Sequence, residues 1–288
     1  PGYSGTENPA RSEYMKKNLS NIILILVFLI GLSLLLYPSV SDYWNSFRQT
    51  RAIASYTEAV ADINQEEYEA MWGEAQAYNL ELPRNNSRYI MTDAQRKQYQ
   101  SLLNVSGNGI MGYIEIPSIK CYLPIYHGID ESILQVAIGH IEGTSLPVGG
   151  EGSHCGLSGH RGLPSAKLFT NLDKLVEGDV FMIRVLDEVL TYEVDQILIV
   201  LPNEMEALEI VEGQDYCTLV TCTPYGVNSH RLLVRGHRID NLENAGIIRV
   251  TADALQIDPI IIAPLVAVPI LLVLLVVLLV SNGKKHKK

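Results

Sequence analysis

The chain has 288 residues, with 22 Lys and Arg against 32 Asp and Glu, so its formal net charge is −10. Between residues 38 and 258 the imbalance grows to 15 basic against 30 acidic side chains. This charge excludes nucleic acid as a partner, because binding to phosphates needs the opposite sign. The length allows one sizeable domain with appended segments.

Residues 19–37 form an uncharged, apolar stretch near the N-terminus. About twenty apolar residues span a bilayer core, so we predict a transmembrane helix here, after a short cytoplasmic tail at residues 1–18. A cleaved signal peptide is the alternative, but Tyr37 and Val40 make a poor small-residue cleavage site. The residues before Met15 are not assigned to the fold, because such a stretch can belong to an upstream reading frame.

A second apolar stretch, residues 260–280, holds no charge over 21 residues and is also predicted to cross the lipid bilayer. It follows a linker at residues 251–259 and precedes a basic tail at residues 281–288. Lysines lie before the first predicted span and after the second. The positive-inside rule therefore puts both termini in the cytoplasm and the segment between the spans outside the cell membrane.

Between the spans, residues 38–82 repeat apolar side chains every three to four positions, which predicts a juxtamembrane helical segment with a break near Asn64. Residues 83–108 are polar, contain turn residues and lack a clear period, so we expect a lid-like loop. Residues 109–250 then change to short β-type runs separated by Gly and Pro.

The eight β-type runs indicate a mainly β domain folded as a closed or nearly closed β-barrel. One helix, Ala166–Leu175, is expected to interrupt them. The predicted strands are Met111–Ile116, Cys121–Tyr126, Val136–Ile141, His154–Ser158, Val180–Leu186, Val189–Leu201, Tyr216–Thr221 and Leu232–Ile239.

Four cysteines occur in the predicted barrel, without a CxxC motif or a spacing suited to zinc. Cys217 and Cys222 lie five residues apart on one predicted strand, so they face opposite sides and cannot form a disulfide with each other. A disulfide between Cys121 and Cys155 is an open alternative. The favoured interpretation is that these thiols are small buried hydrophobic groups.

The segment from Thr218 to Ile239 carries the strongest functional signal. Cys222 ends one predicted strand, a turn-rich stretch follows, and Arg231 precedes the next strand. Two strands joined in this way are neighbours, so a thiol and a guanidinium are expected at the same end of a sheet. A cation next to a cysteine is a usual setting for a reactive thiol.

A cysteine nucleophile also needs a proton carrier, and the histidines are the candidates. His160 lies between two glycines at the end of a predicted strand, where backbone can approach a ligand closely. His230 and His237 compete because they share the hairpin with Cys222. His230 is adjacent to Arg231 and, by strand alternation, points to the opposite face.

The motifs TLVTC around Cys222, SGHRG around His160, and Arg231 nine residues after the cysteine resemble the pattern of the sortase family. These are membrane-anchored cysteine transpeptidases of Gram-positive bacteria. The stretches SGHRGLPSAKLFTNLDKL and GYIEIPSI and the second apolar segment resemble class C, the pilus-assembling sortases. The resemblance covers residues from about 40 to 280.

The resemblance implies an eight-stranded sortase β-barrel and a reaction at an LPXTG-like sorting signal. Cys222 would attack the Thr–Gly carbonyl of a pilin or other surface protein, and a lysine amine of the next pilin would resolve the thioacyl enzyme. His160 would carry protons, and Arg231 would stabilise the oxyanion or the substrate backbone. Thr221 is a candidate substrate contact. The resemblance implies no cofactor and no metal, and the acidic residues form no EF-hand loop.

The chain departs from the class C pattern in the segment before the barrel. Many class C sortases carry an Asp-Pro-aromatic motif there that plugs the cysteine pocket, but residues 79–108 contain no such triplet. Tyr89 is the first candidate for a residue that fills the site instead. We therefore do not extend to this chain the autoinhibition that the lid motif gives other class C sortases.

Two other functions are kept as alternatives. One is a sortase that attaches proteins to a cell-wall precursor, and the other is an inactive membrane-tethered scaffold for pilus assembly. The intact set of Cys222, His160 and Arg231 argues against the scaffold. A papain-like protease is disfavoured because the cysteine lies late on a strand.

Overall fold

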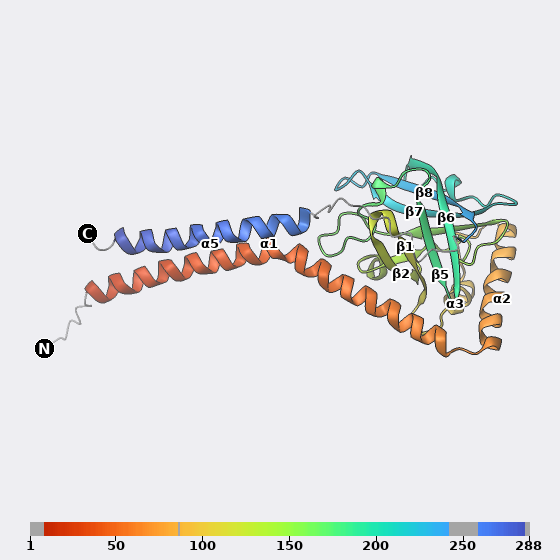
Figure 1. Ribbon diagram of the computed structural model, residues 1–288, viewed down its shortest axis with the longest axis horizontal. Helices are drawn as coiled ribbons and strands as arrows, with labels where there is room; N and C mark the ends of the chain where they lie inside the picture. The colour runs from red at the N-terminus through yellow and green to blue at the C-terminus, as the bar shows by residue number, and fades with distance from the viewer. Residues whose placement is uncertain (1–8, 86, 242–258, 286–288) are drawn as a thin grey trace. The chain divides into compact units, whose positions relative to one another are not determined.

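The computed structural model describes the backbone of residues 9–85, 87–241 and 259–285 (Figure 1). The chain divides into two compact units. One consists of residues 1–41 with residues 253–288, and the other of residues 42–252. The second unit contains the β-barrel, and the two units are described separately below.

Two long helices form the described part of the first unit. Helix α1, Pro9–Asp62, begins in this unit and continues into the second, and helix α5 is Pro259–Lys285. Within the described residues, the helical segment Asn21–Asp62 is long and apolar enough to cross a membrane, and a shorter apolar stretch is Val266–Val280. Both predicted spans are thus helical where the backbone is described.

The predicted helical segment at residues 38–82 forms with the expected break. Helix α1 ends at Asp62, and helix α2, Gln65–Glu81, begins after Asn64. Asn64 accepts from the backbone N–H of Glu67, whose carboxylate accepts from the N–H of Asn64. This reciprocal cap satisfies two backbone donors at the helix start and fixes the break. A 3₁₀ turn, η1, follows at Leu82–Arg84.

The prediction of a loop without regular structure before the barrel is only partly right. Helix α3, Asp93–Ser101, lies within that segment. Thr92 and Gln95 form a capping box at its start, the same device that begins α2. The spacing Thr-x-x-Gln is a sequence signature of a helix start that could have indicated this helix despite the polar composition of the segment.

The eight predicted strands are present, and each boundary agrees within two residues. They close into a barrel in the order β1-β2-β3-β4-β7-β8-β6-β5. Most neighbours are antiparallel, whereas β2–β3 and β4–β7 are parallel pairs. The strands are β1 Ile110–Ile116, β2 Cys121–His127, β3 Ile138–His140, β4 Ser153–Ser158, β5 Val180–Val185, β6 Glu188–Val200, β7 Asp215–Thr223 and β8 His230–Ile239.

The predicted helix Ala166–Leu175 is wrong. Leu168 has φ +38°, a left-handed conformation that a right-handed helix cannot contain, and Ala166 forms an isolated β-bridge with Leu163. Only the 3₁₀ turn η3, Leu172–Lys174, remains of it. The other short elements are helix α4, Glu131–Leu134, and the 3₁₀ turns η2, Pro117–Ile119, and η4, Glu206–Leu208.

The core fills the barrel and extends under the N-terminal helices of the second unit. Leu219 of β7 and Val234 of β8 are fully buried inside it. Tyr56 joins α1 to the barrel, since its hydroxyl donates to Met111 O at 2.9 Å and accepts from Leu186 N–H at 2.8 Å. Asn79 does the same for α2, with both bonds to the backbone of Leu146. These buried polar contacts fix where the helices lie on the barrel.

Candidate active site

Three predicted site residues meet at one end of three neighbouring strands. Strands β4 and β7 are parallel, with Ser158 opposite Val220, so His160 and Cys222 each follow this pair by two residues. Strands β7 and β8 are antiparallel, with Cys222 directly opposite Arg231. Side chains at opposite positions of such a pair lie on the same face of the sheet. The sequence could place Cys222 next to Arg231, and the structure adds His160 through the parallel pair.

The backbone around His160 is held by hydrogen bonds on both sides. Gly159 N–H donates to Val220 O at 3.0 Å, which extends the β4–β7 pairing beyond the end of β4. Phe169 N–H donates to His160 O at 3.1 Å, so the segment predicted as a helix instead folds back on the histidine. A Cβ at Gly159 would come within 2.7 Å of the Phe169 ring, which explains the glycine.

Cys222 is the cysteine that lies opposite Arg231 at the end of the β7–β8 pair. All four cysteines are free thiols, so the alternative of a disulfide between Cys121 and Cys155 is wrong for this structure. Cys155 and Cys217 are buried, whereas Cys121 and Cys222 are partly exposed. Burial raises the pKa of the Cys121 thiol to about 12, and it raises the pKa of Cys217 as well. These two thiols therefore stay protonated at neutral pH and are poor nucleophiles.

The side chain of His160 faces a residue that the sequence did not single out. Its Nε2 atom lies 3.4 Å from a carboxylate oxygen of Glu131, the first residue of α4. The two side chains are 26% and 69% exposed, respectively. No sequence signal links Glu131 to His160, because the contact depends on how β3 and β4 pair.

Arg231 fixes the β7–β8 loop as well as lying opposite Cys222. Its Nη1 donates to Asn228 O at 3.3 Å and to His230 O at 3.1 Å. Asn228 has φ +59°, a conformation that Asn tolerates better than most residues. Within the part of the chain that the structure describes, the other guanidinium nitrogens have no partner. They can therefore donate to a ligand at the sheet end.

A second arginine, Arg161, lies beside the same site. Its guanidinium pairs with Asp173 and donates to the Thr223 hydroxyl at 3.4 Å, next to Cys222. The ring of Tyr225 packs on Gly162, where a Cβ would come within 2.6 Å of it. These contacts connect the loop after His160 to the end of β7 and to the β7–β8 loop.

The hydroxyl of Thr221 is engaged inside the protein, and a contact of its backbone with substrate stays a prediction. Its side chain is 2% exposed, and its hydroxyl donates to Gly159 O at 2.7 Å. The expected role as a substrate-binding hydroxyl is therefore replaced by an internal one. Thr221 ties the cysteine strand to the residue before His160.

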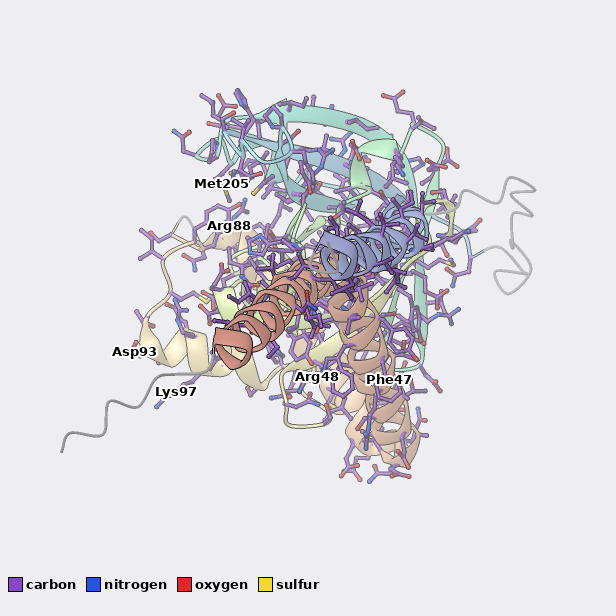
Figure 2. The ribbon with its side chains drawn as sticks, turned by 90° about the vertical axis from the view of Figure 1, so that its left-hand side faces the viewer. Phe47, Arg48, Arg88, Asp93, Lys97 and Met205 are labelled. Carbon is purple, nitrogen blue, oxygen red and sulfur yellow. The ribbon has the colours of Figure 1, made fainter. Side chains whose placement is uncertain are left out.

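Tyr89, the lid candidate, is not brought to Cys222. It packs against Gly143, where a Cβ would come within 2.7 Å of the ring, and Ser145 N–H donates to His154 O near the start of β4. Gly156 N–H, further along β4, donates to Thr144 Oγ1, and His160 lies four residues beyond Gly156, past the end of the strand. Arg88, the residue before Tyr89 and labelled in Figure 2, pairs with Glu209 at 2.9 Å.

The competing histidines are also separated from the site. His237 lies opposite Tyr216, toward the other end of β7. His230 lies opposite Thr223 and contacts Ser229, consistent with its expected position on the other face. Among the residues that the structure describes, no group of three His, Cys, Asp or Glu side chains is placed to hold a metal ion.

Comparison with known proteins agrees with this geometry. A sortase domain model matches residues 114–239. The crystal structure of sortase C1 from Streptococcus agalactiae is 50% identical, covers 67% of this chain and 100% of its own, and superposes with a TM-score of 0.65. The chain belongs to the sortase family.

A second sortase C structure agrees with class C, and a sortase A agrees with the family. Sortase C from Clostridium perfringens, solved with the C-terminal cell wall sorting motif, is 44% identical over 67% of this chain and 100% of its own, with a TM-score of 0.60. Sortase A from Bacillus anthracis is 25% identical over 221 residues, which is 77% of this chain and 95% of that protein. The predicted sortase fold and cysteine transpeptidase class are confirmed.

Proposed function

We propose that this sortase is a membrane-anchored pilin polymerase that cleaves an LPXTG-like sorting signal between Thr and Gly and joins pilins through lysine isopeptide bonds. The observation that carries the proposal is the register that brings His160, Cys222 and Arg231 to one end of the sheet. The likeness to class C sortases supports the choice of substrate. The Clostridium perfringens relative was solved with a sorting motif, and the structure of Streptococcus pneumoniae sortase C gave insights into pilin substrate specificity.

The chemistry follows from the three side chains. The Cys222 thiol gives its proton to the His160 imidazole, and the thiolate attacks the Thr carbonyl carbon. Arg231 stabilises the resulting oxyanion, because its guanidinium is cationic at any working pH. His160 then protonates the Gly amine as the Thr–Gly bond breaks, which leaves a thioacyl enzyme on Cys222.

A lysine amine completes the cycle. His160 takes a proton from the incoming amine, whose nitrogen attacks the thioester carbon, and Cys222 leaves as the thiolate. The product is an isopeptide bond between the Thr of one pilin and the Lys of the next. The proposal assigns no cofactor and no metal to either half of the reaction.

The anchoring is part of the same proposal. A helix at each end, residues 19–37 and 260–280, would cross the cell membrane, with both termini in the cytoplasm and the catalytic barrel outside. The apolar composition of both helices supports this arrangement. The proposal gives residues 83–108 no lid role, because Tyr89 lies beside Gly143.

The test is transpeptidation by the full-length protein in detergent micelles. It is incubated with a pilin that carries an LPXTG-like signal and an acceptor lysine. A ladder of lysine-linked pilins, identified by mass spectrometry of the branched peptides, is expected. Transfer only to a cell-wall precursor amine would favour the anchoring function, and polymerisation that persists in Cys222→Ala would favour a scaffold.

A further inference from the structure

The contact between Glu131 and His160 has no role in the reaction described above. The Nε2 atom of His160 is buried and makes no hydrogen bond of good geometry to the described residues. Its ion-pair contact among them is with Glu131 Oε2, at 3.4 Å. A buried nitrogen that can carry a proton is costly without an acceptor, and a carboxylate is the acceptor that also favours the protonated ring.

The fold brings Glu131 to this position. Helix α4 lies between β2 and β3, and the start of β3 is next to the end of β4, with Gly139 opposite Ser158. The segment before β3 therefore approaches the residues that follow β4. The Glu131 carboxylate also accepts from the Gln135 side chain, one helical turn later. Gln49 of α1 donates to Val136 O at 2.7 Å and holds the end of α4.

The other charged groups near His160 have different partners. Arg161, the next residue, is directed to Asp173 and Thr223. Arg231 is directed to the carbonyls of Asn228 and His230. Asp130, beside Glu131, makes no side-chain cap on α4, and no contact with His160 occurs within the described part of the chain. Glu131 is the carboxylate that faces the imidazole.

We propose that Glu131 is a positioning residue for His160, whose carboxylate accepts the Nε2–H and leaves Nδ1 to exchange the proton of the reaction. The inference rests on the proposed function. When Nδ1 takes the proton from the Cys222 thiol, the S–H bond breaks and the ring becomes an imidazolium with N–H on both nitrogens. Glu131 stays ionised and balances that charge, as the acid of a Ser-His-Asp triad does. Nδ1 then gives its proton to the Gly amine.

The carboxylate is suited to this task. Hydrogen bonding from Gln135, together with the charge of His160, lowers the pKa of Glu131, so it is ionised at neutral pH. Its exposure means that the pair contributes little to folding. We therefore expect changes at Glu131 to alter the reaction and to leave the thermal midpoint of unfolding unchanged.

The experiment measures kcat and KM for cleavage of a sorting-signal peptide by the full-length protein in detergent, between pH 5 and pH 9. Glu131→Gln removes the charge and keeps an oxygen acceptor, and Asp130→Asn removes an equal charge from the adjacent residue. We expect Glu131→Gln to lower kcat roughly five- to fiftyfold with little change in KM, and Asp130→Asn to stay within about twofold of wild type. The acid limb of the kcat/KM profile should move to lower pH in Glu131→Gln only, because the inactive imidazolium form of His160 loses a neighbouring negative charge.

Two results would overturn the inference. One is a Glu131→Gln enzyme with wild-type kcat and wild-type limbs. The other is an equal loss in Glu131→Gln and Asp130→Asn without any movement of a limb, which would mean a structural role or a general charge effect. Cys222→Ala, measured alongside, separates the two proposals. If it retains activity, the proposed function fails, whereas an inactive Cys222→Ala with an unaltered Glu131→Gln rejects only the role of Glu131.

Discussion

A histidine lies near each end of the paired strands β4 and β7, and the two histidines differ in their hydrogen bonding. At the start of these strands, His154 is buried, its Nδ1 donates to Glu209 O at 2.8 Å, and its Nε2 accepts from the Thr218 hydroxyl at 2.7 Å. At their other end, His160 makes no hydrogen bond through its Nε2 to the described residues, and Cys222 is partly exposed. A histidine with both nitrogens hydrogen-bonded supports the fold, whereas His160, whose Nε2 faces the Glu131 carboxylate, can move a proton through Nδ1 as proposed above.

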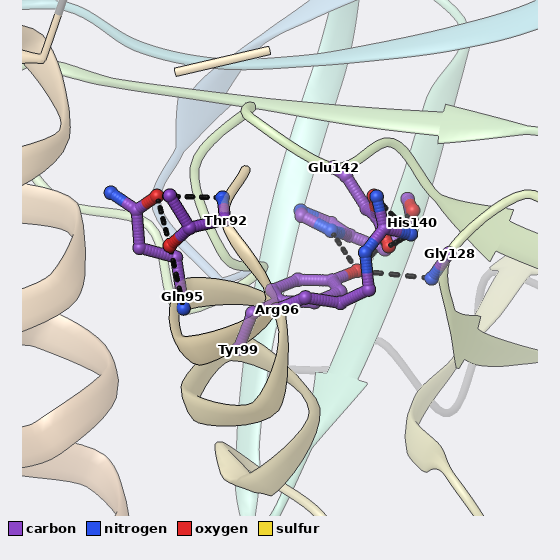
Figure 3. A network of polar contacts seen from close by, with 7 residues as sticks. All are labelled: Thr92, Gln95, Arg96, Tyr99, Gly128, His140 and Glu142. Carbon is purple, nitrogen blue, oxygen red and sulfur yellow. Dashed lines mark hydrogen bonds and ion pairs between the residues drawn. The ribbon is translucent and has the colours of Figure 1, made fainter. Parts of the chain in front are cut away.

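The end of the strands at His154, called the satisfied end below, extends to helix α3. The Tyr99 hydroxyl accepts from Gly128 N–H at 3.0 Å and contacts His140 Nδ1 at 2.9 Å, as Figure 3 shows. His140 Nε2 lies 2.8 Å from Ser145 O, a carbonyl that can only accept. Nε2 therefore carries the ring proton, and Nδ1 accepts from Tyr99. The network locks α3 onto the barrel.

The largest effect on activity is expected when His160 is removed. His160→Ala should lower kcat/KM for transpeptidation by about 10²–10⁴-fold, because it removes the proposed proton carrier. The matched control is His237→Ala, a partly exposed histidine at the other end of the hairpin. It should keep activity within about twofold. Equal losses of kcat/KM in both variants would contradict the assignment of the reaction to the end of the strands that carries His160.

The satisfied end is expected to respond in stability rather than in activity. Tyr99→Phe leaves Gly128 N–H and His140 Nδ1 without their buried partner, and should cost about 1–3 kcal/mol in the free energy of unfolding. The control is Tyr89→Phe, whose hydroxyl contacts Arg88 on a 37% exposed ring and should change stability by less than about 0.5 kcal/mol. Urea unfolding of the detergent-solubilised protein measures both. The expectation fails if the two variants unfold alike.

Acidification should destabilise the satisfied end through His154. Burial lowers the pKa of His154 below 6.5, so the folded protein keeps it neutral while the unfolded chain binds a proton as the pH falls through that value. The free energy of unfolding should therefore decrease below pH 6.5, by up to about 1.4 kcal/mol per pH unit for this group. His154→Gln should flatten the slope, and His237→Gln should not. A slope unchanged by His154→Gln would contradict the assignment.

The smallest effect is expected where helix α1 supports the reactive end. Asn45 donates to Ser165 O at 2.8 Å, in the loop that follows His160. Asn45→Ala should cost about 1 kcal/mol and lower kcat a few-fold, because that loop loses one anchor. Ser46→Ala, which alters an exposed neighbour on the same helix, is the control. Thermal unfolding and peptide cleavage distinguish the two. If Asn45→Ala matches Ser46→Ala in both, the helix does not support the loop.

The strands were predictable because the β-branched runs repeat with turn residues between them, and Cys222 and Arg231 were predictable as neighbours because one short loop joins their strands. His160 was found through the family resemblance, since only the non-local β4–β7 pairing brings it to Cys222. The contact of Glu131 with His160 depends in the same way on the non-local β3–β4 pairing, and the packing of Tyr89 on Gly143 is also a non-local contact. The helix expected at Ala166–Leu175 does not form, because Leu168 is left-handed and Phe169 N–H bonds to His160 O, a non-local contact that composition does not reveal.

The most direct test of the account is to identify the acylated residue. The full-length protein is mixed with a peptide carrying an LPXTG-like signal, without an amine acceptor, and quenched with acid within seconds. Mass spectrometry of the digest should find the acyl group, ending at Thr, on the peptide that contains Cys222, and the signal should vanish in Cys222→Ala. Cleavage that proceeds with the acyl group on Cys121, Cys155 or Cys217, or with no acyl-enzyme in either protein, would contradict the assignment of Cys222 as the nucleophile.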